Sequence, residues 1–282
     1  MSRKVHRVFK LHILASGSKG NAAIVEETAN GQCILIDCGI SKRDFLARCD
    51  EVSVNPANIS DVLITHEHAD HTKGLGVVTR GLEKMGVAFT MRTSMKIRNA
   101  SPDIADALKS ENVDFCAIGT DQSNDTQRLL DVEVKAFQTS HDAAQSFGFR
   151  FESMLSSDTL AYLTDTGVVT DEAKQALQFA RIVALESNHD IDMLMNGPYP
   201  YPLKRRISSE RGHLSNEQAA CALDELLSSL GGHTLEHLVA MHISQENNTY
   251  DKPLAHLGEV IERFSHKASV NVSHQVHAIS VG

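Results

Sequence analysis

The chain has 282 residues, of which 41% are hydrophobic and 22% are charged, and its formal net charge is −9. This length supports one large domain or two small ones, and no run of about 20 apolar residues predicts a membrane-spanning helix. The acidic balance excludes a general polyanion-binding surface, although it allows a local basic groove. The five cysteines have no CxxC spacing, which favours reduced thiols over zinc ligands.

The N-terminal half predicts strands that alternate with short helices. The stretch 8–15 is apolar but contains Lys10 and His12, so we expect a strand there rather than a cleaved signal peptide, and a cytoplasmic protein. Further elements are expected as strands at 22–27, 32–37, 61–65 and 87–91 and as helices at 41–49 and 73–86. Residues 92–128 are more polar and less periodic, which favours an inserted region of helices and loops.

The C-terminal half repeats the strand pattern. Its elements are expected as strands at 129–140, 146–153, 158–164, 181–187 and 237–244 and as helices within 211–232 and 253–264. Ser215 and Gln218 form a capping box for the first of these helices, and Gly231 suits its C-terminal cap. The alternating tail at 269–280 predicts a closing strand. Together the two halves predict two sheets with helices outside, each sheet contributed by half of the chain.

The segment THEHADH at 65–71 follows a short buried strand and is the densest group of metal-ligand residues. His66 and His68 are two residues apart, whereas neighbours on one helix face are three or four apart. On a strand or tight loop these two side chains can converge. With Asp70 and His71 they predict a metal-binding loop, and other segments must supply the remaining ligands.

Further ligand-type residues stand where other strands end, namely His141, Asp165 and His242. A ligand at a strand's carboxyl end is held by rigid backbone on one side and is free on the other. With the loop this gives seven candidate ligands, which are too many for one tetrahedral site. We therefore expect two divalent ions, with one aspartate able to bridge them. Histidine ligands suit Zn²⁺, and the carboxylates also admit Mn²⁺.

This order of motifs resembles the metallo-β-lactamase family. The resemblance implies an α/β fold, a four-layer αββα sandwich with the metals at one edge of the sheets. It implies one such domain over 1–282, with the insertion around 92–128. By residue-for-residue matching, one ion is held by His66, His68 and His141, the other by Asp70, His71 and His242, and Asp165 bridges them.

The match narrows to the YycJ/WalJ group, because its motifs occur in order across nearly the whole chain: SGSKGN, SHDAAQ, TDTGVVT, LESNHD, PYPLKRRISSERGHLSNEQAA and HISQENN. The resemblance implies a 5′-to-3′ exonuclease that acts on double-stranded DNA through a hydroxide activated by two metals, and a role in DNA repair. An RNA-processing nuclease and a phosphodiesterase for small cyclic phosphates are the alternatives, because proteins with those activities are related to this group.

The resemblance also implies roles beside the ligand set. His213 lies next to the capping box and is expected to protonate the leaving oxygen, with a histidine of the cap as the alternative. Asp70 is expected to be catalytic as well as a ligand. Asp37 ends a strand and is expected to orient a ligand histidine, although a structural turn also explains it.

Nucleic acid is the expected partner, and no membrane is expected. Phosphate contacts are predicted from a polar loop, a strand end and a basic cluster: Ser18, Asn21, Asn188, Lys204, Arg205, Arg206 and Arg211. A plain hairpin turn is the alternative for the polar loop, and a solvated helix face is the usual explanation of the basic cluster. Tyr199 and Tyr201 suit either base stacking or packing. The sequence leaves the oligomeric state open.

Overall fold

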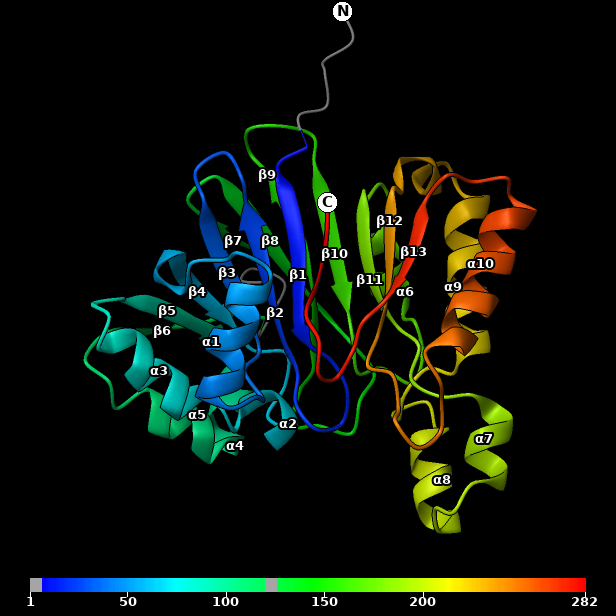
Figure 1. Ribbon diagram of the computed structural model, residues 1–282, viewed down its shortest axis with the longest axis horizontal. Coiled ribbons are helices and arrows are strands. Elements are labelled where there is room, and N and C mark those ends of the chain that lie inside the picture. The colour runs from blue at the N-terminus through cyan, green and yellow to red at the C-terminus, as the bar shows by residue number, and fades with distance from the viewer. Residues whose placement is uncertain (1–6, 120–125) are drawn as a thin grey trace, which may run out of the picture.

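The computed structural model describes residues 7–119 and 126–282, and within them the strands form two seven-stranded sheets (Figure 1). The strands of the N-terminal sheet are β1 (Phe9–Ala15), β2 (Ala22–Glu27), β3 (Gln32–Ile36), β4 (Ile59–Leu63), β5 (Phe89–Thr93), β6 (Val113–Ala117) and β14 (Ile279–Val281). Those of the C-terminal sheet are β7 (Thr126–Leu129), β8 (Val132–Gln138), β9 (Phe147–Ser153), β10 (Thr159–Leu163), β11 (Ile182–Glu186), β12 (His237–Met241) and β13 (Ser269–Val272). Their orders are β14-β1-β2-β3-β4-β5-β6 and β13-β12-β11-β10-β9-β8-β7.

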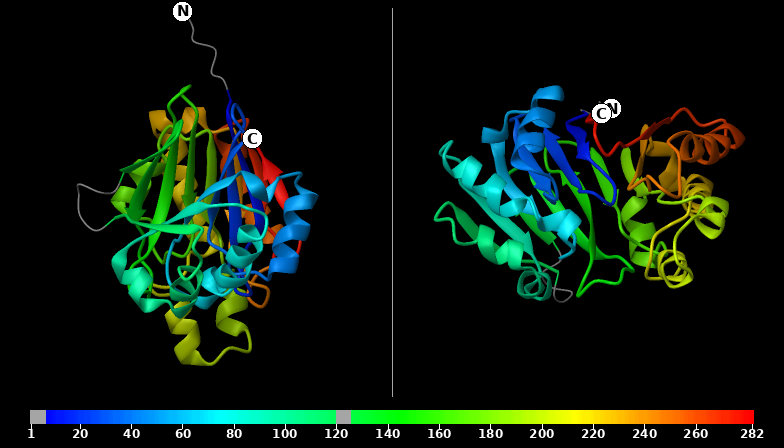
Figure 2. Two further views of the ribbon diagram at one scale, coloured as in Figure 1. Left: turned by 90° about the vertical axis from the view of Figure 1, so that its left-hand side faces the viewer. Right: turned by 60° about the horizontal axis from the view of Figure 1, so that its bottom comes forward.

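Helices cover the outer face of each sheet, as the views in Figures 1 and 2 show. On the N-terminal sheet these are α1 (Lys42–Glu51), α3 (Leu75–Glu83), α4 (Met95–Ala100) and α5 (Pro102–Ala107), and on the C-terminal sheet α6 (Asp171–Leu177), α9 (Asn216–Ser228) and α10 (Asp251–Arg263). The remaining helical elements are α2 (Ala69–Thr72), α7 (Ile191–Asn196), α8 (Tyr201–Ile207) and the 3₁₀ turns η1 (Pro56–Asn58) and η2 (Leu230–Thr234). The predicted αββα sandwich is confirmed. In the part of the chain that is described, no helix is long and apolar enough to span a bilayer.

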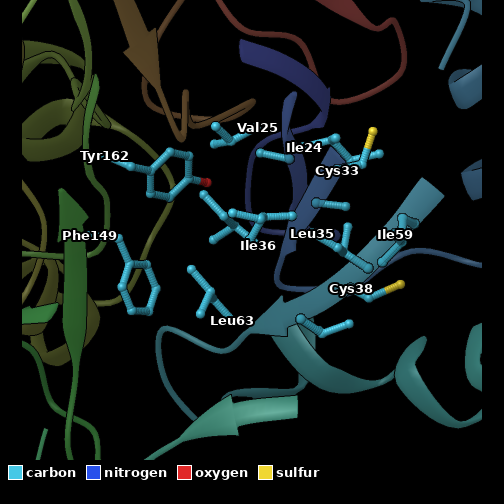
Figure 3. Packing of buried hydrophobic residues seen from close by; sticks show 14 of the residues in the cluster. Ile24, Val25, Cys33, Leu35, Ile36, Cys38, Ile59, Leu63, Phe149 and Tyr162 are labelled. Carbon is cyan, nitrogen blue, oxygen red and sulfur yellow. The ribbon is translucent and has the colours of Figure 1, made fainter. Parts of the chain in front are cut away.

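The core between the two sheets is built from the apolar side chains of the strands. Figure 3 shows Phe149 and Tyr162 of the C-terminal sheet pointing toward Ile36 and Leu63 of the N-terminal sheet. All four are at most 1% exposed. Burying a side chain of this size contributes roughly 1.5–3 kcal/mol relative to exposure, so the contact between the sheets is a principal source of stability. A second core lies between the C-terminal sheet and its helices.

The carboxyl ends of the parallel strands meet at one edge of the sandwich. The strands β3 to β6 run parallel in one sheet, and β10 to β13 run parallel in the other. In Figure 1 this is the lower edge, where α2, α7 and α8 lie. Residues that directly follow β3, β4, β10, β11 and β12 are therefore gathered at one place, as the strand-end argument predicted.

Two C-terminal predictions and one central one were wrong in detail. The expected strand at 129–140 is present as β8, but its first residues belong to the turn that joins β7 to β8, where Leu130 adopts a left-handed φ of 53°. The expected closing strand at 269–280 is two strands, of which β13 pairs with β12 and β14 pairs with β1. The N-terminal sheet is therefore completed by the C-terminus. Helix α9 ends at Ser228, so Gly231 lies in η2 and is not its cap.

The segment 92–128 supplies α4, α5 and one edge strand to each sheet, except for 120–125, which lie outside the described residues. Its assignment as an insertion within one domain stays a prediction. The helices α6, α7 and α8 were not among the predicted elements. For α8 the reason is that two prolines near its start made the segment look like a turn. Pro200 is the N-cap and Pro202 lies in the first turn of the helix, where a missing N–H is tolerated.

Candidate metal centre

The THEHADH segment is part loop and part helix. His66 and His68 follow β4 in irregular backbone, and α2 begins directly after His68, so Asp70 and His71 lie on its one turn. The turn is held tightly against the chain that follows β3, because a Cβ on Gly39 would lie 1.6 Å from the carbonyl oxygen of Asp70. The prediction of a tight loop is therefore corrected for the second half of the segment.

One group of possible metal ligands consists of His66, His68 and His141, each offering a ring nitrogen within 4.8 Å of the others. His68 Nδ1 and His141 Nε2 are 3.3 Å apart. His66 Nε2 is buried and finds no hydrogen-bond partner among the described residues. Three imidazole nitrogens that face one space, one of them unpartnered, are the donor set that a divalent transition metal prefers.

A second group consists of Asp70, His71 and His242. His242 Nε2 is also buried without a hydrogen-bond partner in the described part of the chain. Asp165 lies between the two groups: its Oδ2 is 3.3 Å from His71 Nε2, and its Oδ1 is 3.9 Å from His141 Nε2. The structure thus brings all seven predicted ligands together at one place.

Three residues at this edge adopt left-handed backbone conformations that are uncommon outside glycine. Asp37, Asp165 and His242 have φ values of 56°, 51° and 57°, and each stands one or two residues beyond the end of its strand. Asp and His tolerate this conformation better than most residues do. Such conformations cluster at functional sites, where the surrounding structure holds them in place.

Asp37 contacts His71 on the side of its ring that points away from the cluster. Its Oδ2 lies 2.7 Å from His71 Nδ1 and accepts the hydroxyl of Thr65 at 2.7 Å, while its Oδ1 accepts the N–H of Thr65 at 2.8 Å. The contact fixes the ring so that Nε2 faces the cluster. This is the geometry expected of a carboxylate that orients a ligand histidine.

The histidines of the cluster differ in their ionisation because their neighbours differ. Burial, and then the charge on His71, hold the pKa of His66 well below its usual range. Burial also opposes charge on His71 and His242, but neighbouring carboxylates, Asp165 foremost, outweigh it and raise their pKa values to about 10 and about 9. In the metal-free chain, therefore, these two rings carry protons that a bound ion would displace.

Glu186, at the end of β11, was missed in the sequence analysis. It is fully buried, and its Oε1 lies 2.7 Å from His213 Nδ1 and 3.0 Å from His242 Nδ1. Burial alone would raise its pKa, but His213 and His242 lower it to about 2. A carboxylate in the apolar strand 181–187 was the available signal, because a buried charge must be paired. His213 itself is about one-fifth exposed, so it is linked to the cluster and also open to solvent.

Two of the predicted substrate contacts are buried against residues of the cluster rather than exposed at the surface. Asn21 is 1% exposed, with its Nδ2 2.9 Å from His71 Nε2. Asn188 is also buried and donates to the carbonyl of His242 at 2.8 Å. Ser18, by contrast, is exposed in the loop that leads to Asn21. These positions leave Ser18 accessible to a ligand and make the two asparagines neighbours of the candidate ligand histidines.

The basic cluster is mostly engaged with the protein itself. Lys204 Nζ donates to the carbonyls of Met195 and Gly197 at 2.8 Å each. Arg206 donates to Asp142, and Arg211 donates to the carbonyl of His141, the residue that precedes Asp142. Within the described residues, the side chain of Arg205 is the one member of the four that forms no hydrogen bond or ion pair, and it is exposed. The cluster thus secures α8 beside the metal centre.

Residues 32–243 match the family described as the beta-lactamase superfamily domain. The chain is 33% identical over 250 residues to the exodeoxyribonuclease YycJ of Bacillus anthracis, covering 89% of this chain and 88% of that protein. The chain belongs to the beta-lactamase superfamily. It is also 32% identical over 273 residues to the exodeoxyribonuclease WalJ of Streptococcus pneumoniae, covering 96% and 94% of the two chains.

A solved structure confirms the superfamily fold. The metallo-beta-lactamase fold protein YhfI from Bacillus subtilis superposes with a TM-score of 0.68 at 15% identity, covering 97% of this chain and 99% of that one. Membership of the superfamily and the similarity to YycJ and WalJ confirm the predicted resemblance and the prediction of a hydrolase. The clusters described above fit the divalent metal binding that was predicted.

Proposed function

We propose that this chain is a metal-dependent exonuclease that degrades double-stranded DNA from 5′ ends. The observation that carries the proposal is the joining of two possible metal groups through Asp165, with the hydrogen-bonded pair of Glu186 and His213 directly beside them. The names of YycJ and WalJ, exodeoxyribonucleases that match nearly the whole chain, support DNA as the substrate.

The residues present fit two divalent ions, Zn²⁺ or Mn²⁺. His66, His68 and His141 would hold one ion, Asp70, His71 and His242 would hold the other, and Asp165 would contact both. The unpartnered nitrogens of His66 and His242 support this assignment, because buried polar atoms are otherwise satisfied. When bound, such ions lower the pKa of a water molecule and neutralise charge on a phosphate.

His213 and Asp70 are the residues that we assign to proton transfer. Glu186 lies at His213 Nδ1 and so fixes the ring in the orientation that leaves Nε2 for the substrate. As the phosphodiester bond breaks, His213 donates a proton to the leaving oxygen. The Asp70 side chain is about one-quarter exposed, while those of Asp165 and Glu186 are at most 3% exposed. Asp70 is therefore the cluster carboxylate best placed to accept a proton from the attacking water.

The proposal is tested first with His213→Ala. We expect this variant to keep the wild-type metal content and to lose about 10²- to 10⁴-fold in turnover on duplex DNA, which is the usual contribution of one acid–base group. Loss of bound metal would make His213 a ligand and contradict the assignment. Unchanged turnover would remove it from the reaction.

An RNA-processing nuclease is the second candidate, because one short match favours it. The chain is 48% identical over 50 residues, or 18% of its length, to ribonuclease Z of Mycobacterium marinum. The chemistry would be the same, so only substrate preference separates the two. Hydrolysis of a tRNA precursor with duplex DNA left intact would favour this candidate. The cytoplasmic location and the role in DNA repair stay predictions.

A further inference from the structure

The segment between β11 and α9 leaves the body of the sandwich as two short helices beside the metal centre. Figures 1 and 2 show α7 and α8 projecting from the edge where α2 lies. The segment begins a few residues after Glu186 and ends at His213, and these two side chains are 2.7 Å apart. The projection is therefore anchored near both ends by the proposed proton donor, His213, and by the carboxylate that orients it, Glu186.

Polar bonds fasten α8 at several points. Lys204 ties it to the end of α7 through the carbonyls of Met195 and Gly197, at 2.8 Å each. Arg206 ties it to Asp142, next to a proposed metal ligand. The N–H of His213 closes the end of the helix on the carbonyl of Ile207 at 2.9 Å. The helix is thus fixed in position relative to the cluster.

No residue of α8 is fully buried against the described part of the protein, and its leucine and isoleucine are half-buried on one side of the helix. The other side therefore has surface left for another molecule. Tyr201 is 67% exposed. Arg205 is four residues further along, so the two side chains share one face of the helix. Pro200 and Pro202 restrict the backbone on both sides of the tyrosine.

We propose that the Tyr201–Arg205 face binds the nucleic acid beyond the scissile phosphate and gives the enzyme its preference for a polymer. The inference rests on the proposed function and adds a substrate-binding element to it. An aromatic ring stacks on any base, and a guanidinium pairs with a phosphate, so the two together suit a nucleotide without selecting its sequence. Because the face is already ordered, little conformational entropy is lost on binding.

The adjoining helix offers a second exposed stripe. Ile191 and Met195 are four residues apart on α7 and are 45% and 50% exposed. Apolar side chains of this kind contact bases rather than phosphates. The pair of helices therefore presents aromatic, aliphatic and cationic groups within one projection, which fits the unpaired end of a strand better than an intact duplex surface.

The test compares two substrates, linear duplex DNA and bis(4-nitrophenyl) phosphate, for the wild type and the variants Tyr201→Ala, Tyr201→Phe and Arg205→Ala. We expect Tyr201→Ala to lower the ratio of kcat/KM for DNA to kcat/KM for the small diester by about tenfold, in line with the loss of one stacking contact. Tyr201→Phe keeps the ring and should restore the ratio. Arg205→Ala should reduce the slope of log kcat/KM for DNA against log salt by about one.

Leu155→Ala is the matched control, because Leu155 is 56% exposed in the connection between β9 and β10, at the opposite edge of the sheets. It should change neither the ratio nor the salt slope. A wild type that cleaves both substrates, with ratio and slope unchanged in Tyr201→Ala and Arg205→Ala, would overturn this inference and leave the proposed function standing. A wild type that cleaves the small diester but not DNA would overturn the proposed function and the inference together.

Discussion

Replacing Glu186 with glutamine changes one oxygen of a buried carboxylate into an NH₂ group that has no good acceptor in either orientation. Oε1 lies 2.7 Å from His213 Nδ1 and 3.0 Å from His242 Nδ1. Oε2 accepts the N–H groups of Thr166 at 2.8 Å and of Leu214 at 3.3 Å. If the amide nitrogen takes the place of Oε2, these two buried N–H groups are left without an acceptor. If it takes the place of Oε1, His213 Nδ1 must accept and its proton moves to Nε2, whereas His242 Nδ1 keeps the Oδ1 atom of Asp165 as an acceptor at 3.2 Å.

Each orientation has a measurable cost. Two unsatisfied buried donors cost about 1–3 kcal/mol each in the free energy of unfolding. In the other orientation, His242 loses one of the carboxylates that orient its ring, and the loss of an orienting carboxylate commonly weakens metal affinity about 10- to 100-fold. It also misorients His213, for which we expect kcat to fall at least about 10²-fold, by the same logic as in other histidine–carboxylate pairs.

The assay measures three quantities for Glu186→Gln and for His213→Ala: metal per chain by mass spectrometry, the unfolding midpoint in urea without metal, and kcat with saturating Mn²⁺. We expect Glu186→Gln to lower kcat and also either metal content or stability, whereas His213→Ala should lower kcat and keep the wild-type metal content. Wild-type kcat and metal content in Glu186→Gln would refute the role given to this carboxylate.

Three further predictions concern other parts of the structure. Asp37→Ala removes the acceptor behind His71 and should weaken metal binding about 10- to 100-fold, measured by chelator competition; undiminished affinity would contradict the orienting role. Asp158→Asn breaks the buried ion pair with Arg181, whose N···O distance is 2.7 Å, and should cost about 3–5 kcal/mol in urea unfolding; a change below about 1 kcal/mol would count against it. Burial lowers the pKa of His189 from 6.5 to about 4, so its contribution to stability is complete above pH 6.5 and falls as pH drops toward 4, by about 2 kcal/mol at pH 5. His189→Asn should remove that part of the pH dependence between pH 8 and pH 5, and an unchanged profile would contradict it.

The fold and the grouping of the candidate metal ligands were predictable because both depend on local patterns. Apolar strands of five to seven residues read clearly, and parallel strands place their carboxyl ends at one edge, so His141, Asp165 and His242 could be joined to the THEHADH segment from position alone. The capping box of Ser215 and Gln218 likewise fixed the start of α9. These features are set by neighbours in sequence.

Features that depend on distant partners were not predictable in the same way. Glu186 is one charge in an apolar strand, and its importance depends on His213 and His242, which are 27 and 56 residues away. The basic cluster suggested a single phosphate-binding surface, yet Arg206 binds Asp142, 64 residues away. The tail divided into two strands because one part pairs with β12 and the other with β1, a choice that the alternating pattern does not encode.

The central claim is a two-metal exonuclease that acts on duplex DNA from 5′ ends. The most direct measurement is the release of nucleotide from linear duplex DNA labelled at its 5′ ends, with purified protein and added Mn²⁺. We expect labelled mononucleotide to appear early, before the bulk of the DNA is degraded. Intact DNA from protein that carries two bound ions per chain would contradict the claim and would direct attention to RNA or a small phosphodiester as the substrate.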